Sequence, residues 1–236
     1  MGICYSESYT HIPIREQTRI EKILTEHERL LPFASIPGKK VDMILRKYSI
    51  RGKLSRQELT SAFTEMGLKL SKHIEDPTGE CYRFFSEIKD GFLYDATKIG
   101  LCGILISTGT QQEKAQLLFE HYDSLHEKLL NARTVKGMFK EIISMSVEYL
   151  PLLSLGDTPQ HLDEEELEEF QDMCMFHRNK LINRLMTMLL GDRQDIYLVE
   201  FEKKMSLDTT LSQLLWSSCT RSLLIQESKY DPSNIS

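Results

Sequence analysis

Apolar residues recur at three- and four-residue spacing along most of the chain, which is the pattern of amphipathic helices. The spacing predicts a leading helix over 12–31, and Pro32, Pro37 and Gly38 follow it as end signals. Two further helices are expected over 41–48 and 59–66, each with one apolar face. The residues expected on these faces are Val41, Ile44, Leu45 and Tyr48 in the first helix, and Leu59, Phe63 and Met66 in the second.

The segment between these two helices has an order of residues that recurs along the chain. Gly52 is followed two residues later by Leu54 and four residues after that by Glu58. This is the order of a calcium-binding helix–loop–helix unit, in which glycine permits a sharp bend and the final acid chelates the ion. The aliphatic residue pairs in a short ribbon with a neighbouring unit. Three more units are expected, with ribbon residues at Leu93, Leu130 and Ile196, and an insertion over 155–170 precedes the last.

Composition narrows the class of protein without naming a function. The 236 residues carry 29 Lys and Arg against 35 Asp and Glu, a net charge of −6, and 41% are hydrophobic. Such a chain is typical of an ordinary globular protein, and the acidic balance argues against nucleic-acid binding. The odd number of widely spaced cysteines (Cys4, Cys81, Cys102, Cys174 and Cys219) indicates a reducing compartment and no disulfide framework.

The first six residues match a lipidation motif. Gly2 and Ser6 fit the M-G-x-x-x-[ST] pattern of N-myristoylation, and Cys4 could take a second acyl chain such as palmitate. One myristoyl chain binds a membrane only marginally, with a K of about 10⁴ M⁻¹, so a second signal is needed for stable anchoring. No polybasic patch follows, and the start lacks the features of a secretory signal. We therefore expect lipidation at Gly2 and Cys4; the alternative is a chance match.

Residues 39–205 resemble the EF-hand superfamily, and within it the four-hand neuronal calcium sensor and calcineurin-B-like group. The segment over 103–123 carries the resemblance: an apolar helix, a short Gly/Ser/Thr turn, then a helix that begins Q-E-K and ends F-x-x-Y-D. The resemblance implies four hands paired in two lobes, each able to present a groove for an amphipathic helix. It also implies an N-terminal myristoylated glycine, which agrees with Gly2.

The loops depart from the calcium-binding pattern, which needs oxygen ligands at positions one, three, five and twelve and glycine at position six. The residues counted at positions one, three, five and twelve are Lys47, Ser49, Arg51 and Glu58; Ser86, Ile88, Asp90 and Thr97; Asp123, Leu125, Glu127 and Thr134; and Leu189, Gly191, Arg193 and Glu200. Since Ca²⁺ takes six to eight oxygens, we expect no metal site and no cofactor. The alternative is one atypical calcium site, built on Asp90 or on Asp123 with Glu127.

Three other features have two interpretations each. The acidic run over 163–169 predicts a solvated helix start, or a contact for a basic partner segment. Cys174 and His177 have a spacing that could serve zinc, but core packing is the better explanation without further ligands. Trp216 belongs either to a last core helix or to an element that covers a groove. No nucleophile, phosphate-loop or metalloprotease motif indicates an enzyme.

The sequence thus predicts an all-α fold of two paired EF-hand lobes with degenerate loops. The expected parts are a lipidated N-terminus and leading helix over 1–32, lobes over 33–110 and 111–225, and a tail over 226–236. The large side chains of Phe63, Phe84, Phe85, Phe119 and Met138 are expected in the core or in a groove. The predicted function is a calcium-insensitive, cytoplasmic, membrane-associated adaptor for a helical segment of a membrane or cytoskeletal protein. A calcium sensor and a structural component of a cilium or cortical cytoskeleton are the alternatives.

Overall fold

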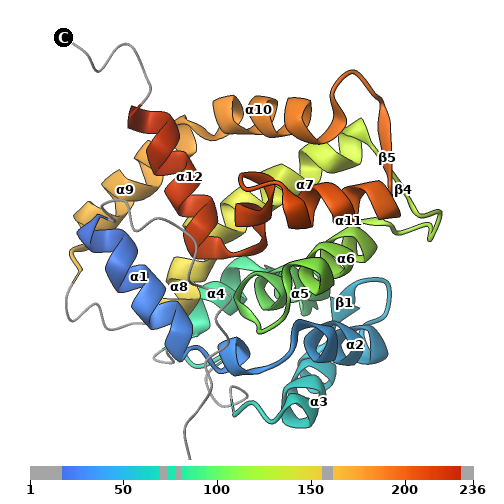
Figure 1. The fold of residues 1–236 in the computed structure, drawn as a ribbon. Helices are drawn as coiled ribbons and strands as arrows, with labels where there is room; N and C mark the ends of the chain where they lie inside the picture. The colour runs from blue at the N-terminus through green and yellow to red at the C-terminus, as the bar shows by residue number, and fades with distance from the viewer. Residues whose placement is uncertain (1–17, 70–73, 78–80, 156–161, 230–236) are drawn as a thin grey trace, which may run out of the picture.

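A computed structural model describes residues 18–69, 74–77, 81–155 and 162–229 of the chain. Over these residues the protein is mostly helical, with a few strands of two or three residues, which confirms the predicted all-α class. Figure 1 shows the helices packed around one another, with the strands in the loops that join them. The helical faces predicted over 41–48 and 59–66 pack inward, although Tyr48 is only partly buried.

The first half of the fold joins four helices through a small antiparallel sheet. Its strand order is β1-β3-β2, and Leu54 in β1 lies opposite Tyr94 in β3. Gly52 and Gly91 both have a positive φ, as the bends before β1 and β3 require. The elements are α2 (Gly38–Tyr48), β1 (Lys53–Leu54), α3 (Arg56–Met66), α4 (Tyr82–Glu87), β2 (Lys89–Asp90), β3 (Leu93–Asp95) and α5 (Ala96–Ile106).

The ladder in this half corrects one prediction, because Tyr94 and not Leu93 lies opposite Leu54. Strands β2 and β3 form a hairpin in which Asp90 faces Leu93 across a two-residue turn. Successive side chains of a strand point to opposite faces, so this register buries Tyr94 and leaves Leu93 42% exposed. A glycine-containing turn, which the pattern of apolar residues does not resolve, therefore decides which residue enters the core.

The second half repeats the arrangement with a simpler ladder. Strand β4 pairs antiparallel with β5, and Leu130 lies opposite Ile196, as predicted. Figure 1 shows this ladder at the right, at one end of the helices that it joins. The elements are α6 (Gln111–Tyr122), β4 (Leu129–Asn131), α7 (Ala132–Ser144), α10 (Arg178–Leu190), β5 (Asp195–Tyr197) and α11 (Leu198–Leu207).

Four further α-helices, two 3₁₀ helices and one π-helical segment complete the described part of the fold. The leading helix begins later than predicted, because Thr18 caps it by accepting a hydrogen bond from the Glu21 backbone N–H. Residues 12–17 of that prediction lie outside the described residues. The elements are α1 (Arg19–Leu30), the 3₁₀ helix η2 (Pro32–Ser35), the π-helical segment η4 (Met145–Tyr149), α8 (Leu150–Leu155), α9 (Glu164–Phe176), the 3₁₀ helix η5 (Leu211–Leu215) and α12 (Ser217–Lys229).

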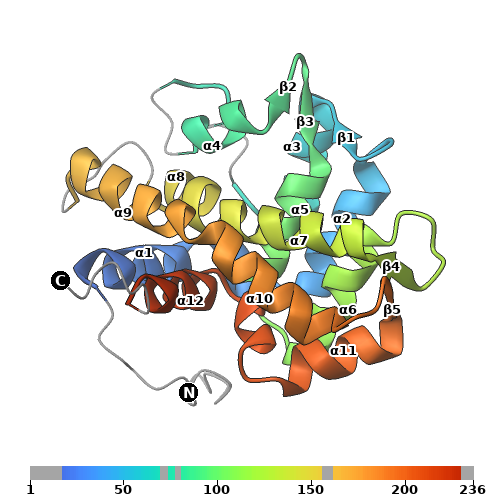
Figure 2. The same cartoon turned by 90° about the horizontal axis from the view of Figure 1, so that it is seen from above.

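These added helices pack against both halves of the fold. Helix α8 lies against α1 and α4, and α12 lies against α1, α7, α9 and α10. In Figure 2, α1 and α12 lie side by side at the lower left, although they come from opposite ends of the described chain. Nearly every turn of α12 contributes a buried residue, so this helix is part of the core.

The large apolar side chains predicted to line a core or a groove are all in the core. Phe63, Phe84, Phe85, Phe119 and Met138 are fully buried. The phenylalanines of the first half stack edge to face, with ring centroids 5.1 to 5.9 Å apart from Phe33 through Phe63 and Phe85 to Phe84. This geometry is the one that aromatic pairs prefer, and it fixes the helices around the β1-β3-β2 sheet.

Candidate functional site

The four loops can be numbered from the residues that the two ladders pair. If the paired residue is the eighth of a twelve-residue calcium loop, the twelfth positions are Glu58, Lys98, Thr134 and Glu200. The corrected register of the second loop therefore places a lysine, in place of Thr97, where a calcium loop has a chelating glutamate.

In the first loop the acidic twelfth residue serves the protein's own backbone. Glu58 accepts a 2.7 Å hydrogen bond from the Ser55 backbone N–H, and the Ser55 hydroxyl accepts one from the Glu58 N–H. These two bonds form a capping box at the start of α3 and lower the pKa of Glu58. Lys47, at the first position, pairs instead with Glu65 at 2.7 Å.

In the second loop Lys98 is bonded to a residue outside the loop. Its Nζ donates a 2.9 Å hydrogen bond to the Tyr149 hydroxyl and lies 4.5 Å from the centre of that ring. Asp95 caps α5 by accepting a 2.9 Å bond from the Thr97 backbone N–H, and Asp90 remains exposed near Lys53. Asp90 thus has a cation 3.7 Å away rather than a set of converging oxygens.

In the third loop Asp123 is turned toward its own loop. Its Oδ1 accepts a 3.0 Å bond from the Glu127 backbone N–H, and its Oδ2 accepts a 2.8 Å bond from that of Lys128. Lys128 stands where the pattern has glycine and has a φ of 56°. In the fourth loop Glu200 forms a bidentate pair with Arg193, which lowers the pKa of Glu200.

Five carboxylates of the described loops are therefore engaged within the chain: Glu58, Asp90, Asp95, Asp123 and Glu200. Across the described residues, no group of three or more His, Cys, Asp or Glu side chains is arranged to hold a metal ion. The atypical calcium site considered from the sequence would need Asp90 or Asp123 to leave the partners given above.

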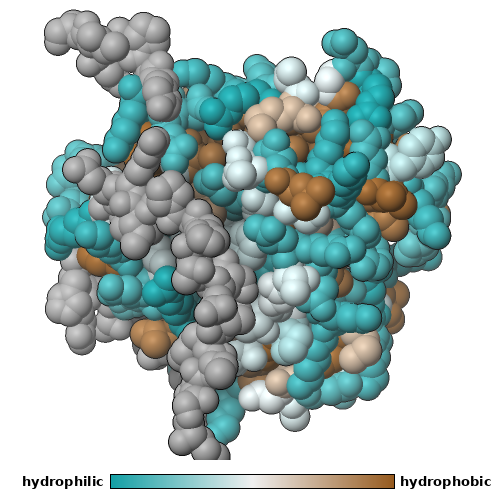
Figure 3. Space-filling model, viewed as in Figure 1, coloured by the Kyte–Doolittle hydropathy of each residue, from teal (hydrophilic) through white to brown (hydrophobic). Residues whose placement is uncertain are grey.

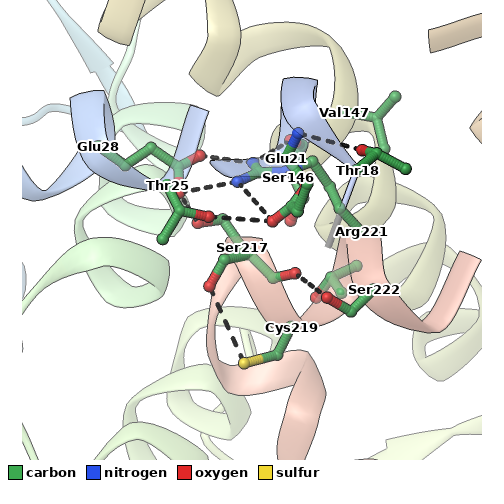
Figure 4. A network of polar contacts seen from close by, with 12 residues as sticks. Thr18, Glu21, Thr25, Glu28, Ser146, Val147, Ser217, Cys219, Arg221 and Ser222 are labelled. Atoms are coloured by element: carbon green, nitrogen blue, oxygen red, sulfur yellow. Dashed lines mark hydrogen bonds and ion pairs between the residues drawn. The ribbon is translucent and has the colours of Figure 1, made fainter. Parts of the chain in front are cut away.

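The most unusual chemistry of the described residues lies at the junction of α1 and α12, where three charged side chains are buried together (Figure 4). Arg221 of α12 is fully buried, and so is Glu21 of α1; Glu28, two turns further along α1, is 5% exposed. Charges are seldom buried unless they are paired and hydrogen-bonded. We call these three residues the Arg221 cluster.

Every donor group of Arg221 has an acceptor. Nη1 donates to Glu28 Oε1 at 2.5 Å and Nη2 to Glu28 Oε2 at 3.1 Å, which is a bidentate pair. Nε donates to Glu21 Oε2 at 2.7 Å, and Nη2 reaches Glu21 Oε1 at 3.4 Å. Nη1 also donates to the Ser146 carbonyl in the π-helical segment at 2.9 Å, so that the guanidinium joins three elements.

Two hydroxyl groups also bond to the glutamates of the Arg221 cluster. Ser217 Oγ donates to Glu28 Oε2 at 2.6 Å, and Thr25 Oγ1 bonds to Glu21 Oε1 at 3.1 Å. Burial disfavours the charge of Glu21 and raises its pKa, although the Arg221 charge works in the opposite direction. Burial also opposes the charge of Arg221, but Glu28 and Glu21 outweigh it and raise the Arg221 pKa. The guanidinium therefore stays charged.

A second buried cation, Lys114 of α6, lies in a different environment. Its Nζ donates to the carbonyl oxygens of Leu105 at 3.3 Å and Leu215 at 3.2 Å, and it lies 5.0 Å from the Trp216 ring centre. Since no carboxylate is bonded to it, burial lowers its pKa to about 7. Lys114 ties the end of α5 to the end of η5. Trp216 is partly buried and packs against the core beside α12.

The remaining candidate residues are placed as follows. Gly2 and Cys4 lie outside the described residues. Cys174 and His177 are both buried at the end of α9, which agrees with core packing. Asp163 caps α9 by accepting a bond from the Glu165 backbone N–H, and Glu166 pairs with Arg19 at 2.8 Å.

Sequence reasoning missed the Arg221 cluster and Lys114. The available signal was an arginine in the middle of an apolar segment, since Arg221 is followed by Leu223, Leu224 and Ile225. Its partners are about 200 residues away in the chain, and only the packing of α1 on α12 brings them together.

No protein-family model matches this chain, and no curated protein matches it in sequence. No helix among the described residues has both the length and the apolar character needed to cross a membrane.

Proposed function

We propose that this chain is an EF-hand-like adaptor that works without calcium, is anchored through acyl groups on Gly2 and Cys4, and binds a helical segment of a partner protein. One observation carries the proposal. Two pairs of helix–loop–helix units are joined by antiparallel ladders, and the twelfth position of each loop is either a non-acid or an acid engaged within the chain. Such units retain the helix–loop–helix arrangement of a calcium-binding hand but lack the ligands for the ion whose binding would change the conformation.

The packing of the added helices limits where a partner can bind. Helix α8 lies against α4 of the first half, and α12 lies against α7 and α10 of the second. We infer that these added helices occupy faces on which a target helix would otherwise bind. The face shown in Figure 3 is mostly hydrophilic, and its hydrophobic residues are scattered. We therefore expect the partner to bind to an exposed helix face and not in a groove between the helices.

The outer face of α9 is the best candidate for this contact. Glu165, Glu168, Glu169 and Asp172 are exposed at spacings of three, four and seven residues, which puts them on one stripe of the helix. The same stripe ends at Phe176, which is 79% exposed. A basic amphipathic helix with one apolar residue near its end would complement this stripe in charge and in shape.

The first test of the proposed function is fractionation of C-terminally tagged wild type beside Gly2→Ala, with and without detergent and with and without calcium. The adaptor proposal expects wild type on membranes, a soluble Gly2→Ala variant, and no effect of calcium. If both proteins stay in a detergent-resistant pellet, the chain is a component of a ciliary or cortical cytoskeletal assembly. If calcium shifts wild type and Asp123→Ala abolishes the shift, the chain is a calcium sensor.

The second test examines α9 directly. Proximity labelling in cells with wild type identifies partners, and the double variant Glu168→Lys/Glu169→Lys should lose at least about ten-fold of their signal. The matched control is Glu87→Lys/Asp192→Lys, which makes the same charge change at exposed positions on other elements. Equal loss in both double variants would mean that net charge, and not the α9 stripe, determines the association.

A further inference from the structure

The Arg221 cluster contains one carboxylate more than its single guanidinium can neutralise. Glu21, Glu28 and Arg221 together would carry a net charge of −1 if all three were ionised, and all three are buried. A buried net charge is costly, and a protein removes that cost by taking up a proton. The cluster is therefore expected to bind one proton, and the geometry indicates which residue binds it.

The hydrogen bonds of Glu28 stabilise a negative charge better than those of Glu21 do. Its two oxygens take the fork of Arg221 at 2.5 and 3.1 Å, and Ser217 donates a third hydrogen bond. In Glu21 only Oε2 has a short bond to the guanidinium, at 2.7 Å. Glu21 Oε1 lies 3.4 Å from Nη2 and 3.1 Å from the Thr25 hydroxyl, which can accept a proton as well as donate one. Glu21 Oε1 is the oxygen that can hold a proton without losing a strong bond.

We propose that the Arg221 cluster is a proton-linked latch, in which a proton on Glu21 Oε1 holds α1 against α12 and loss of this proton loosens α1. In the closed state the neutral carboxyl donates to Thr25 Oγ1, and Oε2 still accepts from Arg221 Nε. When the proton leaves to solvent, two carboxylates share one guanidinium in a buried site. The repulsion between the two carboxylates is relieved when α1 separates from α12.

Other ionisable groups near the cluster do not supply the same switch. The neighbouring thiols are Cys219 of α12, Cys174 of α9, Cys102 of α5 and Cys81 just before α4; burial raises the pKa of Cys219 to about 11 and that of Cys174 to about 12. Burial likewise raises the pKa of Cys102, so Cys219, Cys174 and Cys102 remain neutral thiols near pH 7. Of the π-helical segment, Tyr149 is bonded to Lys98, and Glu148 is only partly buried. Helix α8 has no titratable side chain, Glu227 of α12 pairs with Lys180 and Arg184, and Lys114 is bonded to the carbonyl oxygens of Leu105 and Leu215.

A change at α1 has a structural consequence for the whole chain. Helix α1 directly follows the N-terminal segment and buries Leu24 as well as the two glutamates. Its release would uncover this apolar face together with the side of α12 that carries Arg221. The latch does not depend on the proposed function, because it concerns only contacts between α1, α12 and η4.

Hydrogen exchange tests the latch, with protection factors used so that the intrinsic pH dependence of exchange is divided out. In wild type, followed over a scan from about pH 5 to about pH 10, the protection of amides in 19–30 should fall as the pH rises through the folded pKa of Glu21, which burial raises, by at most about ten-fold per pH unit once the proton leaves. In Glu21→Gln, which mimics the protonated carboxyl, it should stay high and nearly constant. Glu26→Gln, the same change at an exposed position of the same helix, should behave as wild type.

Two results would overturn the latch: constant protection of 19–30 in wild type over this range, or a parallel fall in Glu21→Gln. A second measurement decides the matter even if Glu21→Gln fails to fold. The carbon-13 shift of the Glu21 carboxyl in labelled wild type should report a protonated acid wherever 19–30 is protected and a carboxylate wherever that protection is lost. A carboxylate at a pH where 19–30 is still fully protected would contradict the proposal.

Discussion

The two buried cations of this protein have opposite electrostatic environments. Arg221 is bonded to two carboxylates, whereas Lys114 is bonded to two backbone carbonyls and faces the ring of Trp216. Burial disfavours both charges, but only Arg221 has anions close enough to reverse the effect. The comparison shows that burial alone does not decide whether a charge survives in the core; the number of opposite charges within bonding distance decides it.

The same difference predicts opposite dependences of stability on pH. Lys114 has a lowered pKa in the folded protein, so the unfolded chain binds more protons and the free energy of unfolding should rise above about pH 7. Glu21 has a raised pKa, so the folded protein binds more protons. Its contribution is fully present below the pKa of the unfolded chain and is lost as the pH rises through the folded pKa.

The largest expected effect comes from removing the shared cation. Arg221→Leu leaves Glu21 and Glu28 buried together without a counter-charge, and should lower the free energy of unfolding by about 3–5 kcal/mol. Urea denaturation at pH 7 measures this loss. Arg46→Leu is the control, because Arg46 pairs with Asp42 on an exposed face of α2 and should cost less than about 1 kcal/mol. Similar losses in both variants would remove the distinction between the buried cluster and a surface pair.

A smaller effect is expected at the second cation, and it should depend on pH. Lys114→Met removes a group whose folded pKa is about 7, so the stability difference between wild type and variant should grow in favour of wild type from pH 7 toward pH 10. The growth should be at most about 1.4 kcal/mol per pH unit. Thermal denaturation across this range measures it, with Lys136→Met on the exposed face of α7 as control. A difference that stays constant with pH would show that Lys114 titrates as an ordinary lysine.

The smallest effect concerns a hydroxyl group at the edge of the Arg221 cluster. Ser217→Ala removes the 2.6 Å bond to Glu28 Oε2, which still accepts from Arg221, and should cost about 1 kcal/mol. Because this bond joins α12 to α1, and loss of the Glu21 proton is proposed to release α1, the loss should shrink as the pH rises through the folded pKa of Glu21. Ser222→Ala is the control, since Ser222 bonds only to the Ser218 carbonyl of its own helix. A loss that stays the same on both sides of this transition would mean that the contact between Ser217 and Glu28 persists and that α1 is not released.

The helical class and the order of the loops were accessible from the sequence because both depend on local spacing. Gly52 marks a bend, Leu54 enters the first ladder, and Leu130 and Ile196 were paired correctly although 66 residues separate them. The second loop was predicted one residue out of register, since apolar residues at both 93 and 94 leave the alternation ambiguous. In that loop the hairpin turn at Gly91 and Phe92 sets the register and places Tyr94 opposite Leu54.

The sequence by itself determined where helices form, which faces are apolar, and that the loops have too few acids in ligand positions. Only the tertiary structure decided that α12 is a core helix, that Lys114 meets carbonyls rather than carboxylates, and that Arg221 finds Glu21 and Glu28. The physical reason is range. Helix formation depends on residues three or four positions apart, whereas the charge state of a buried group depends on partners that may be 200 residues away and that only packing brings within bonding distance.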